Sequence, residues 1–188
     1  MLENLLSYDY HPLIVHIPIA FLTVYSLFEI ITTLFFASRF YSFVWTKLLL
    51  LGVGVFGAQG ALFTGEMAED LNREIVSRKI LDAHEEWASF TFSWFLVIFI
   101  IYILIAVANK PFFKTKIDSI VDRFPSFNIF FGILKTIGNF FSKYKVFVLG
   151  MSIVGLVTVS VTGALGGAMV YGRNADPIVI IVLKFLGL

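Results

Sequence analysis

Four long apolar stretches constrain the fold of this chain more than any other feature of its sequence. They are Leu13–Phe36, Leu48–Phe63, Trp87–Ala108 and Val146–Val170, and a helix needs about 20 mostly apolar residues to cross a bilayer. Of the 188 residues, 59% are hydrophobic and only 14% are charged, whereas soluble domains carry roughly 25% charged residues. We therefore expect an all-α integral membrane protein with one domain, residues 1–188, built as an up-down bundle of four helices.

Basic residues are distributed unevenly between the connecting segments. Nine Lys and Arg residues lie in Ser38–Lys47 and Lys110–Lys145, whereas Gly65–Glu86 carries seven acidic residues and only three basic ones. Because cytoplasmic loops retain Lys and Arg, both termini and the acidic loop are expected outside. Within the long inner loop, apolar residues alternate with lysines over residues 112–141, which predicts an amphipathic helix lying in the inner membrane interface.

The composition also limits the chemistry that this chain can perform. It has no Cys, which excludes disulfides, thiolate metal sites and covalently attached c-type haem. The formal net charge of +1 does not fit a generally basic nucleic-acid-binding protein, so no nucleic acid is expected as a partner. No nucleotide-binding loop or hydrolase nucleophile is visible, which favours an electron-transfer protein or a subunit over a stand-alone enzyme.

The expected topology brings all three histidines of the chain to the outer membrane boundary. The first and third spans share the pattern His-x-x-x-Ala-x-x-Thr, with His16 above Ala20 and His84 above Ala88. In a helix this spacing places each Ala one turn below its His on the same face. Two imidazoles that meet from different helices, each above a small side chain, could clamp a b-type haem, which needs no Cys. We predict that His16 and His84 ligate the iron of one haem b.

Further residues near this boundary complete the predicted site. Tyr171 and Arg173 close the fourth span, and Arg173 is a candidate partner of a haem propionate. His11 is left open between a neighbour of the haem, a metal ligand and a surface residue. Two alternatives to haem remain: a non-catalytic subunit of a larger membrane complex, and a divalent metal site of mixed imidazole and carboxylate ligands, built from His11, His16, His84 and Glu66.

Two features inside the spans bear on packing. Glu29 is the one carboxylate deep in a span, and with Tyr25 and Thr33 four residues away on either side it is expected to be a neutral, hydrogen-bonded acid. A proton relay is the alternative for Glu29. The second and fourth spans are rich in glycine, which favours close helix packing. Room for a flat ligand, or the seam of a homodimer, are alternative uses of these glycines.

These residues resemble domain-of-unknown-function family 2231, a group of small four-helix bacterial membrane proteins. The resemblance rests on four motifs: His11-Pro-Leu-Ile-Val-His16-Ile-Pro18-Ile-Ala20, Thr64-Gly65-Glu66, His84-Glu85 and Gly166-Gly167-Ala-Met-Val-Tyr171-Gly172. It covers nearly the whole chain apart from the long inner loop, and it implies a multi-pass protein of the bacterial inner membrane.

The resemblance also implies a function. Members of the family occur fused to Rieske-type or cytochrome c modules, which implies membrane electron transfer, a b-type haem and a redox partner of that kind. The family's histidines map onto His11, His16 and His84. Where some relatives carry a further His, this chain has Ala164 and Leu165, and three histidines cannot fill four axial positions, so one haem is expected.

Overall fold

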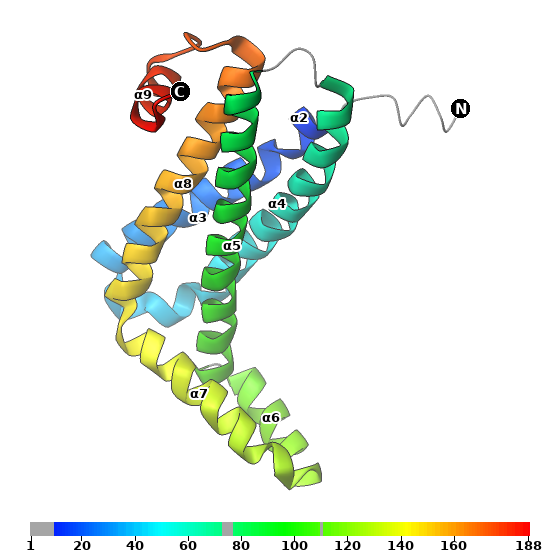
Figure 1. The fold of residues 1–188 in the computed structure, drawn as a ribbon. Coiled ribbons are helices and arrows are strands. Elements are labelled where there is room, and N and C mark those ends of the chain that lie inside the picture. The colour runs from blue at the N-terminus through cyan, green and yellow to red at the C-terminus, as the bar shows by residue number, and fades with distance from the viewer. Residues whose placement is uncertain (1–9, 73–76, 110) are drawn as a thin grey trace.

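The computed structural model describes residues 10–72, 77–109 and 111–188, and this part of the chain is helical and contains no β-strand (Figure 1). The predicted all-α class is therefore confirmed. In chain order the elements are α2 (His11–Ile14), α3 (His16–Phe35), η1 (Ala37–Phe43), α4 (Val44–Asn72), α5 (Arg78–Asn109), α6 (Pro111–Arg123), η2 (Pro125–Phe127), α7 (Asn128–Lys143), α8 (Lys145–Tyr171) and α9 (Pro177–Leu186).

Four helical stretches are long and apolar enough to cross a membrane, as the sequence predicts. They are His11–Phe35, Ala37–Ala68, Arg78–Asn109 and Lys145–Tyr171. The second and third stretches extend well past the apolar segments that predicted them, because the helices continue into the polar sequence on either side of residues 69–77. The four potential spans account for most of the chain.

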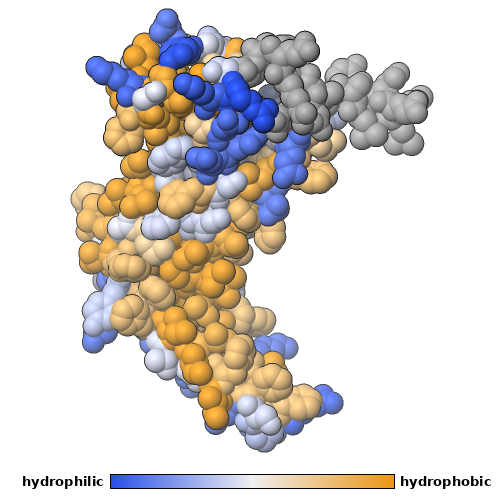
Figure 2. Space-filling view, viewed as in Figure 1, coloured by the Kyte–Doolittle hydropathy of each residue, from blue (hydrophilic) through white to orange (hydrophobic). Residues whose placement is uncertain are grey.

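Most of the apolar surface of these helices faces outward. Only 28% to 39% of the residues in the most apolar window of each stretch are buried, and large side chains such as Ile31, Phe56 and Val157 are exposed. Figure 2 shows hydrophobic side chains over much of the visible face, with hydrophilic ones gathered mainly towards its ends. Soluble monomers rarely expose apolar patches of more than a few hundred Å², so this surface is suited to contact with lipid.

Contacts between helix termini define two ends of the bundle. At one end, His11 of α2 hydrogen-bonds Thr64 near the end of α4, and His84 near the start of α5 lies against the last turns of α8. We call this the histidine end. At the other end, Lys145 at the start of α8 donates a hydrogen bond of 2.7 Å to the carbonyl of Ala37, just after α3. We call this the lysine end.

Glycines allow close contact between neighbouring long helices. A Cβ at Gly57 of α4 would lie 2.7 Å from Ile17 Cγ2 of α3, and a Cβ at Gly155 of α8 would lie 2.7 Å from Phe95 Cζ of α5. Neither position could hold a larger residue without moving the neighbouring helix. Gly163 has open space beside it. Helix packing within the chain therefore explains part of the glycine content of the second and fourth spans, but not Gly163.

The long inner loop forms two amphipathic helices, α6 and α7, instead of the single predicted helix over residues 112–141. Phe124 is extended at φ −136° and ψ 81°, as expected for a residue before proline, so α6 ends at Arg123 and Pro125 begins the turn into α7. The two helices lie side by side and project away from the bundle at the lysine end (Figure 1). Asn109 at the end of α5 donates a hydrogen bond of 2.8 Å to Ser142 of α7.

The C-terminal segment forms helix α9, which packs against α8 at the histidine end (Figure 1). Asp176 caps its start, because Asp176 Oδ1 accepts hydrogen bonds from the backbone N–H groups of Ile178 and Val179, at 2.7 and 3.0 Å. Such a cap satisfies donors that have no partner within the helix. Val179 and Leu183 are buried against the last turns of α8.

Candidate functional site

The histidine end brings two imidazoles together from different helices. The ring centroids of His11 and His84 lie 6.5 Å apart, and the ring planes are nearly perpendicular, at 86°. These residues belong to α2 and α5 and are 73 positions apart in the sequence. Both side chains are half-buried, so the pair lies at the boundary of the bundle and not in its core.

A threonine orients the ring of His11. Its Nδ1 lies 3.2 Å from Oγ1 of Thr64. The Thr64 hydroxyl donates its own proton to the backbone carbonyls of Gly60 and Ala61, at 3.0 and 3.2 Å, so it can only accept a proton from His11. This assigns the proton of the neutral His11 ring to Nδ1 and leaves a lone pair on Nε2.

His84 has the same arrangement on the other side of the pair. Its Nδ1 lies 3.1 Å from the backbone carbonyl oxygen of Thr162 in α8, and a carbonyl can only accept, so Nδ1 donates. The hydroxyl of Thr162 lies 3.0 Å from that of Thr91 on α5, which ties the same two helices together. In both rings Nε2 therefore carries the lone pair with which an imidazole binds a metal, while Nδ1 is held by a hydrogen bond, as is usual for histidine ligands.

Glycines seat both imidazoles on a helix backbone. A Cβ at Gly65 of α4 would lie 3.2 Å from Cε1 of His11, and a Cβ at Gly166 of α8 would lie 3.4 Å from Cε1 of His84. The contact at Gly65 is tighter than a side chain normally tolerates. These two glycines therefore let the rings lie closer to α4 and α8 than any other residue would.

His16 lies apart from this pair. It is exposed at the first residue of α3, and its Nδ1 donates a hydrogen bond of 2.6 Å to the carbonyl of Pro12, one turn earlier. Ala20, one turn further along α3, is also exposed, so this face of the helix points outward. The shared His-x-x-x-Ala pattern does not bring matching faces together, and the imidazole that meets His84 belongs to His11.

The other predicted site residues surround the pair without joining it into a larger ligand set. Ala88 is half-buried one turn below His84, whereas Glu66, Tyr171 and Arg173 are exposed. Over residues 10–72, 77–109 and 111–188, no group of three or more His, Asp or Glu residues is placed to hold a metal ion. Glu66 is therefore not gathered with the two imidazoles.

A second polar cluster lies inside the bundle, towards the lysine end. Glu29 of α3 and Lys47 of α4 form an ion pair with 2.8 Å between Oε2 and Nζ, and both side chains are completely buried. Glu29 also accepts a hydrogen bond of 2.7 Å from the hydroxyl of Thr33 and another from the hydroxyl of Tyr102 on α5. Three side chains from three helices thus hold this carboxylate.

The Lys47 ammonium is held by charge and by aromatic rings. Among the residues that the structure describes, Nζ has no hydrogen-bond acceptor in good geometry, although Glu29 Oε2 lies at ion-pair distance. The ring centroids of Phe40 and Tyr102 lie 4.5 and 5.6 Å from Nζ, within the range of cation–π attraction. Since a buried charge is costly without its partner, each member of the pair depends on the other.

Tyr25 extends the cluster to the fourth long helix. Its hydroxyl lies 3.0 Å from Oγ of Ser152 on α8, and its ring meets that of Tyr102 edge to face with centroids 6.0 Å apart. The predicted contact between Glu29 and Thr33 is present, but Tyr25 is bonded to Ser152, and Lys47 makes Glu29 half of an ion pair. The sequence interpretation missed Lys47 because it grouped this residue with the basic residues of an inner loop, whereas α4 already begins at Val44.

Comparisons with known proteins give no further identification, because no protein-family model, curated protein or solved structure matches this chain.

Proposed function

We propose that this chain is a multi-pass protein of the bacterial inner membrane, with both termini and the histidine end outside. Four helices with outward apolar surfaces support insertion. The lysines of α6 and α7 support the orientation, because basic segments are retained on the cytoplasmic side. Membership of domain-of-unknown-function family 2231 is part of this proposal, and it rests on the motifs around His11, Gly65, His84 and Gly166.

Within this membrane protein, we propose that His11 and His84 hold one b-type haem for electron transfer. The observation that carries the proposal is the pair of imidazoles, each with Nδ1 anchored and Nε2 available for a metal. With metal–nitrogen bonds of about 2 Å, a metal between one nitrogen of each ring separates the centroids by roughly 6 Å, close to the 6.5 Å between His11 and His84. Perpendicular rings suit axial ligation, since each ring can rotate about its metal–nitrogen bond.

The number of protein ligands favours haem over a bare divalent ion. Protein sites for ions such as zinc use three or four side-chain ligands, and the described part of the chain gathers no such group around the two imidazoles. Haem supplies four nitrogens of its own, so two histidines complete its coordination. A haem ligated on both faces supplies one-electron transfer and leaves no position for substrate.

The chain's own residues would set the properties of this site. Thr64 and the carbonyl of Thr162 hold the two imidazoles in one tautomer and orientation, which keeps both Nε2 atoms available without a proton rearrangement. The exposed Arg173 at the same end remains the candidate partner of a propionate. A redox partner outside the membrane, of cytochrome c or Rieske type, could approach a pair that is half-buried at the end of the bundle.

The cofactor content of the detergent-purified protein tests this proposal. We expect one haem per chain in a pyridine haemochrome assay, and we expect acidified acetone to extract it, because the chain has no Cys for a covalent link. Metal analysis of the same sample separates the alternatives. One divalent ion per chain without haem would contradict the haem and favour a metal site, and protein with neither would contradict both.

A further inference from the structure

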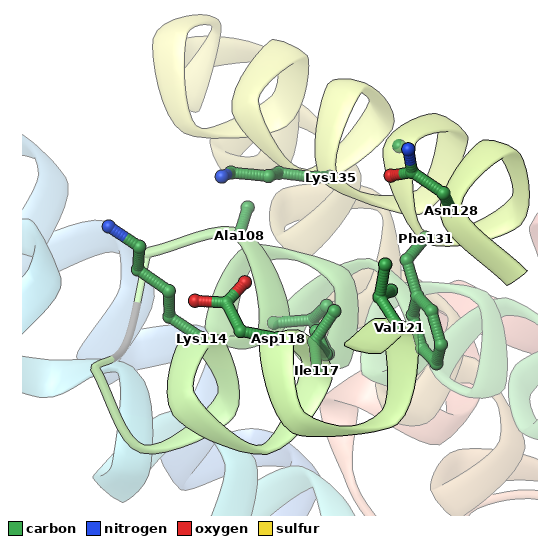
Figure 3. A pocket seen from close by; sticks show the side chains of 10 residues that line it. Ala108, Lys114, Ile117, Asp118, Val121, Asn128, Phe131 and Lys135 are labelled. Atoms are coloured by element: carbon green, nitrogen blue, oxygen red, sulfur yellow. The ribbon is translucent and has the colours of Figure 1, made fainter. Parts of the chain in front are cut away.

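A cavity lies where α6 and α7 leave the bundle. Its volume is about 270 Å³, and it is enclosed by the end of α5 and by the facing sides of α6 and α7 (Figure 3). Val107, two residues before the end of α5, forms part of its wall, together with Ile117 and Val121 of α6 and Phe131 of α7. An apolar wall at the last turn of a potential span lies at the depth where lipid chains meet their headgroups.

Three charged side chains line the same cavity. Lys114 of α6 and Lys135 of α7 stand on opposite walls and extend towards the same side, and the carboxylate of Asp118 lies between them (Figure 3). All three are exposed, and within the described residues none of them takes part in an ion pair. The cavity therefore combines apolar walls with two cations and one anion.

We propose that this cavity binds one anionic phospholipid, with its phosphate between Lys114 and Lys135 and the start of an acyl chain on the apolar wall. The inference rests on the proposed membrane insertion but not on the haem. At about 30 Å³ for each water molecule, the cavity corresponds to roughly nine waters, enough for a headgroup or a chain segment but not for a whole lipid. Basic pockets on the cytoplasmic side commonly bind anionic headgroups.

The charges favour an anionic lipid over a zwitterionic one. The two lysines attract a phosphate, but they repel the quaternary ammonium of phosphatidylcholine. A glycerol headgroup carries no such cation, and its hydroxyls can donate to Asp118. The distinguishing feature of the site is therefore a preference for phosphatidylglycerol, and not membrane contact in general.

Native mass spectrometry of the full chain in detergent, titrated with dioleoylphosphatidylglycerol or dioleoylphosphatidylcholine, tests this inference. The wild-type protein should bind one phosphatidylglycerol more tightly than phosphatidylcholine. Replacing both Lys114 and Lys135 with serine should weaken phosphatidylglycerol binding about 25-fold, at about fivefold for each lysine near an anionic lipid. Asp118→Asn should strengthen it, because the substitution removes the one negative charge from the cavity.

The matched control replaces Lys116 and Lys143 with serine. These exposed lysines lie on the same two helices and outside the cavity, so binding should change less than twofold although the net charge changes equally. A loss equal to that of the cavity variant would overturn the proposal in favour of diffuse surface charge. Free glycerol phosphate that binds as tightly as the lipid would also overturn it, since the occupant would then be a soluble anion.

A variant that changes no charge tests the apolar wall. Gly132 lines the cavity, and a Cβ there would meet no atom within 4 Å. Gly132→Trp should therefore fill the cavity without disturbing α7, and glycine is the poorer helix former of the two. We expect it to abolish phosphatidylglycerol binding while the far-ultraviolet circular dichroism stays unchanged. Retained binding in this folded variant would contradict the site, whatever the haem content of the protein.

Discussion

Replacing Lys47 with methionine should lower the free energy of unfolding by about 3 to 5 kcal/mol, the usual cost of removing one partner of a buried ion pair. Methionine fills a similar volume, so the cost comes from Glu29 and not from a cavity. Glu29 is completely buried, and without the ammonium it must either stay charged in an apolar interior or take up a proton. Chemical denaturation of the protein in detergent, followed by circular dichroism, measures this difference.

A second substitution separates the charge from the packing. In the double variant Glu29→Gln with Lys47→Met no charge remains, and the glutamine can still accept hydrogen bonds from Thr33 and Tyr102. We expect the double variant to recover most of the lost stability, because well-packed neutral groups often replace a buried ion pair at little cost. Lys143→Met, at an exposed position, is the control and should change stability by less than about 0.5 kcal/mol. A double variant no more stable than Lys47→Met would contradict the ion-pair account.

Replacing either His11 or His84 with alanine should abolish the low-spin haem spectrum. Each substitution removes one of two axial ligands, and the described residues near the pair offer no third imidazole: His16 is exposed and bonded to Pro12. His16→Ala is therefore the matched control at the same end of the bundle and should retain the spectrum. Absorbance of the purified variants, normalised to protein concentration, measures the effect.

A milder substitution tests the orientation of the ring. Thr64→Val keeps the shape of the side chain but removes the hydroxyl that binds Nδ1 of His11. Loss of such a partner typically weakens metal binding by about 10- to 100-fold, so the variant should lose haem on dilution faster than the wild type. If His16→Ala lost the spectrum while His11→Ala kept it, the ligand pair would be His16 and His84, and the proposed pair would be wrong.

Hydropathy was sufficient to predict the helices but not their faces. The four stretches were visible because each has enough apolar residues to cross a bilayer. The rotation of α3 was not visible, since both the lipid-facing side and the packed side of such a helix are apolar. His16 and Ala20 were therefore assigned to the inner face, whereas the structure exposes both and directs His11 towards His84.

Lys47 shows the same difficulty with a charged residue. In a linear sequence it follows a polar segment and counts as part of a basic loop, and only the packing of α4 against α3 shows that its ammonium meets Glu29. Thr64 and Gly65 could have been connected with His11 through the motif that ends the second span. Their contacts with the ring depend on the short helix α2, which no periodicity predicts in four residues.

The absorbance spectrum of the wild-type protein, purified in detergent after expression with ample haem, tests the central claim most directly. The air-oxidised and dithionite-reduced forms would be compared. We predict a sharp Soret band that shifts on reduction, together with narrow alpha and beta bands, as a low-spin haem with two histidine ligands gives. A colourless protein, or a high-spin spectrum that changes when carbon monoxide is added, would contradict ligation by both His11 and His84.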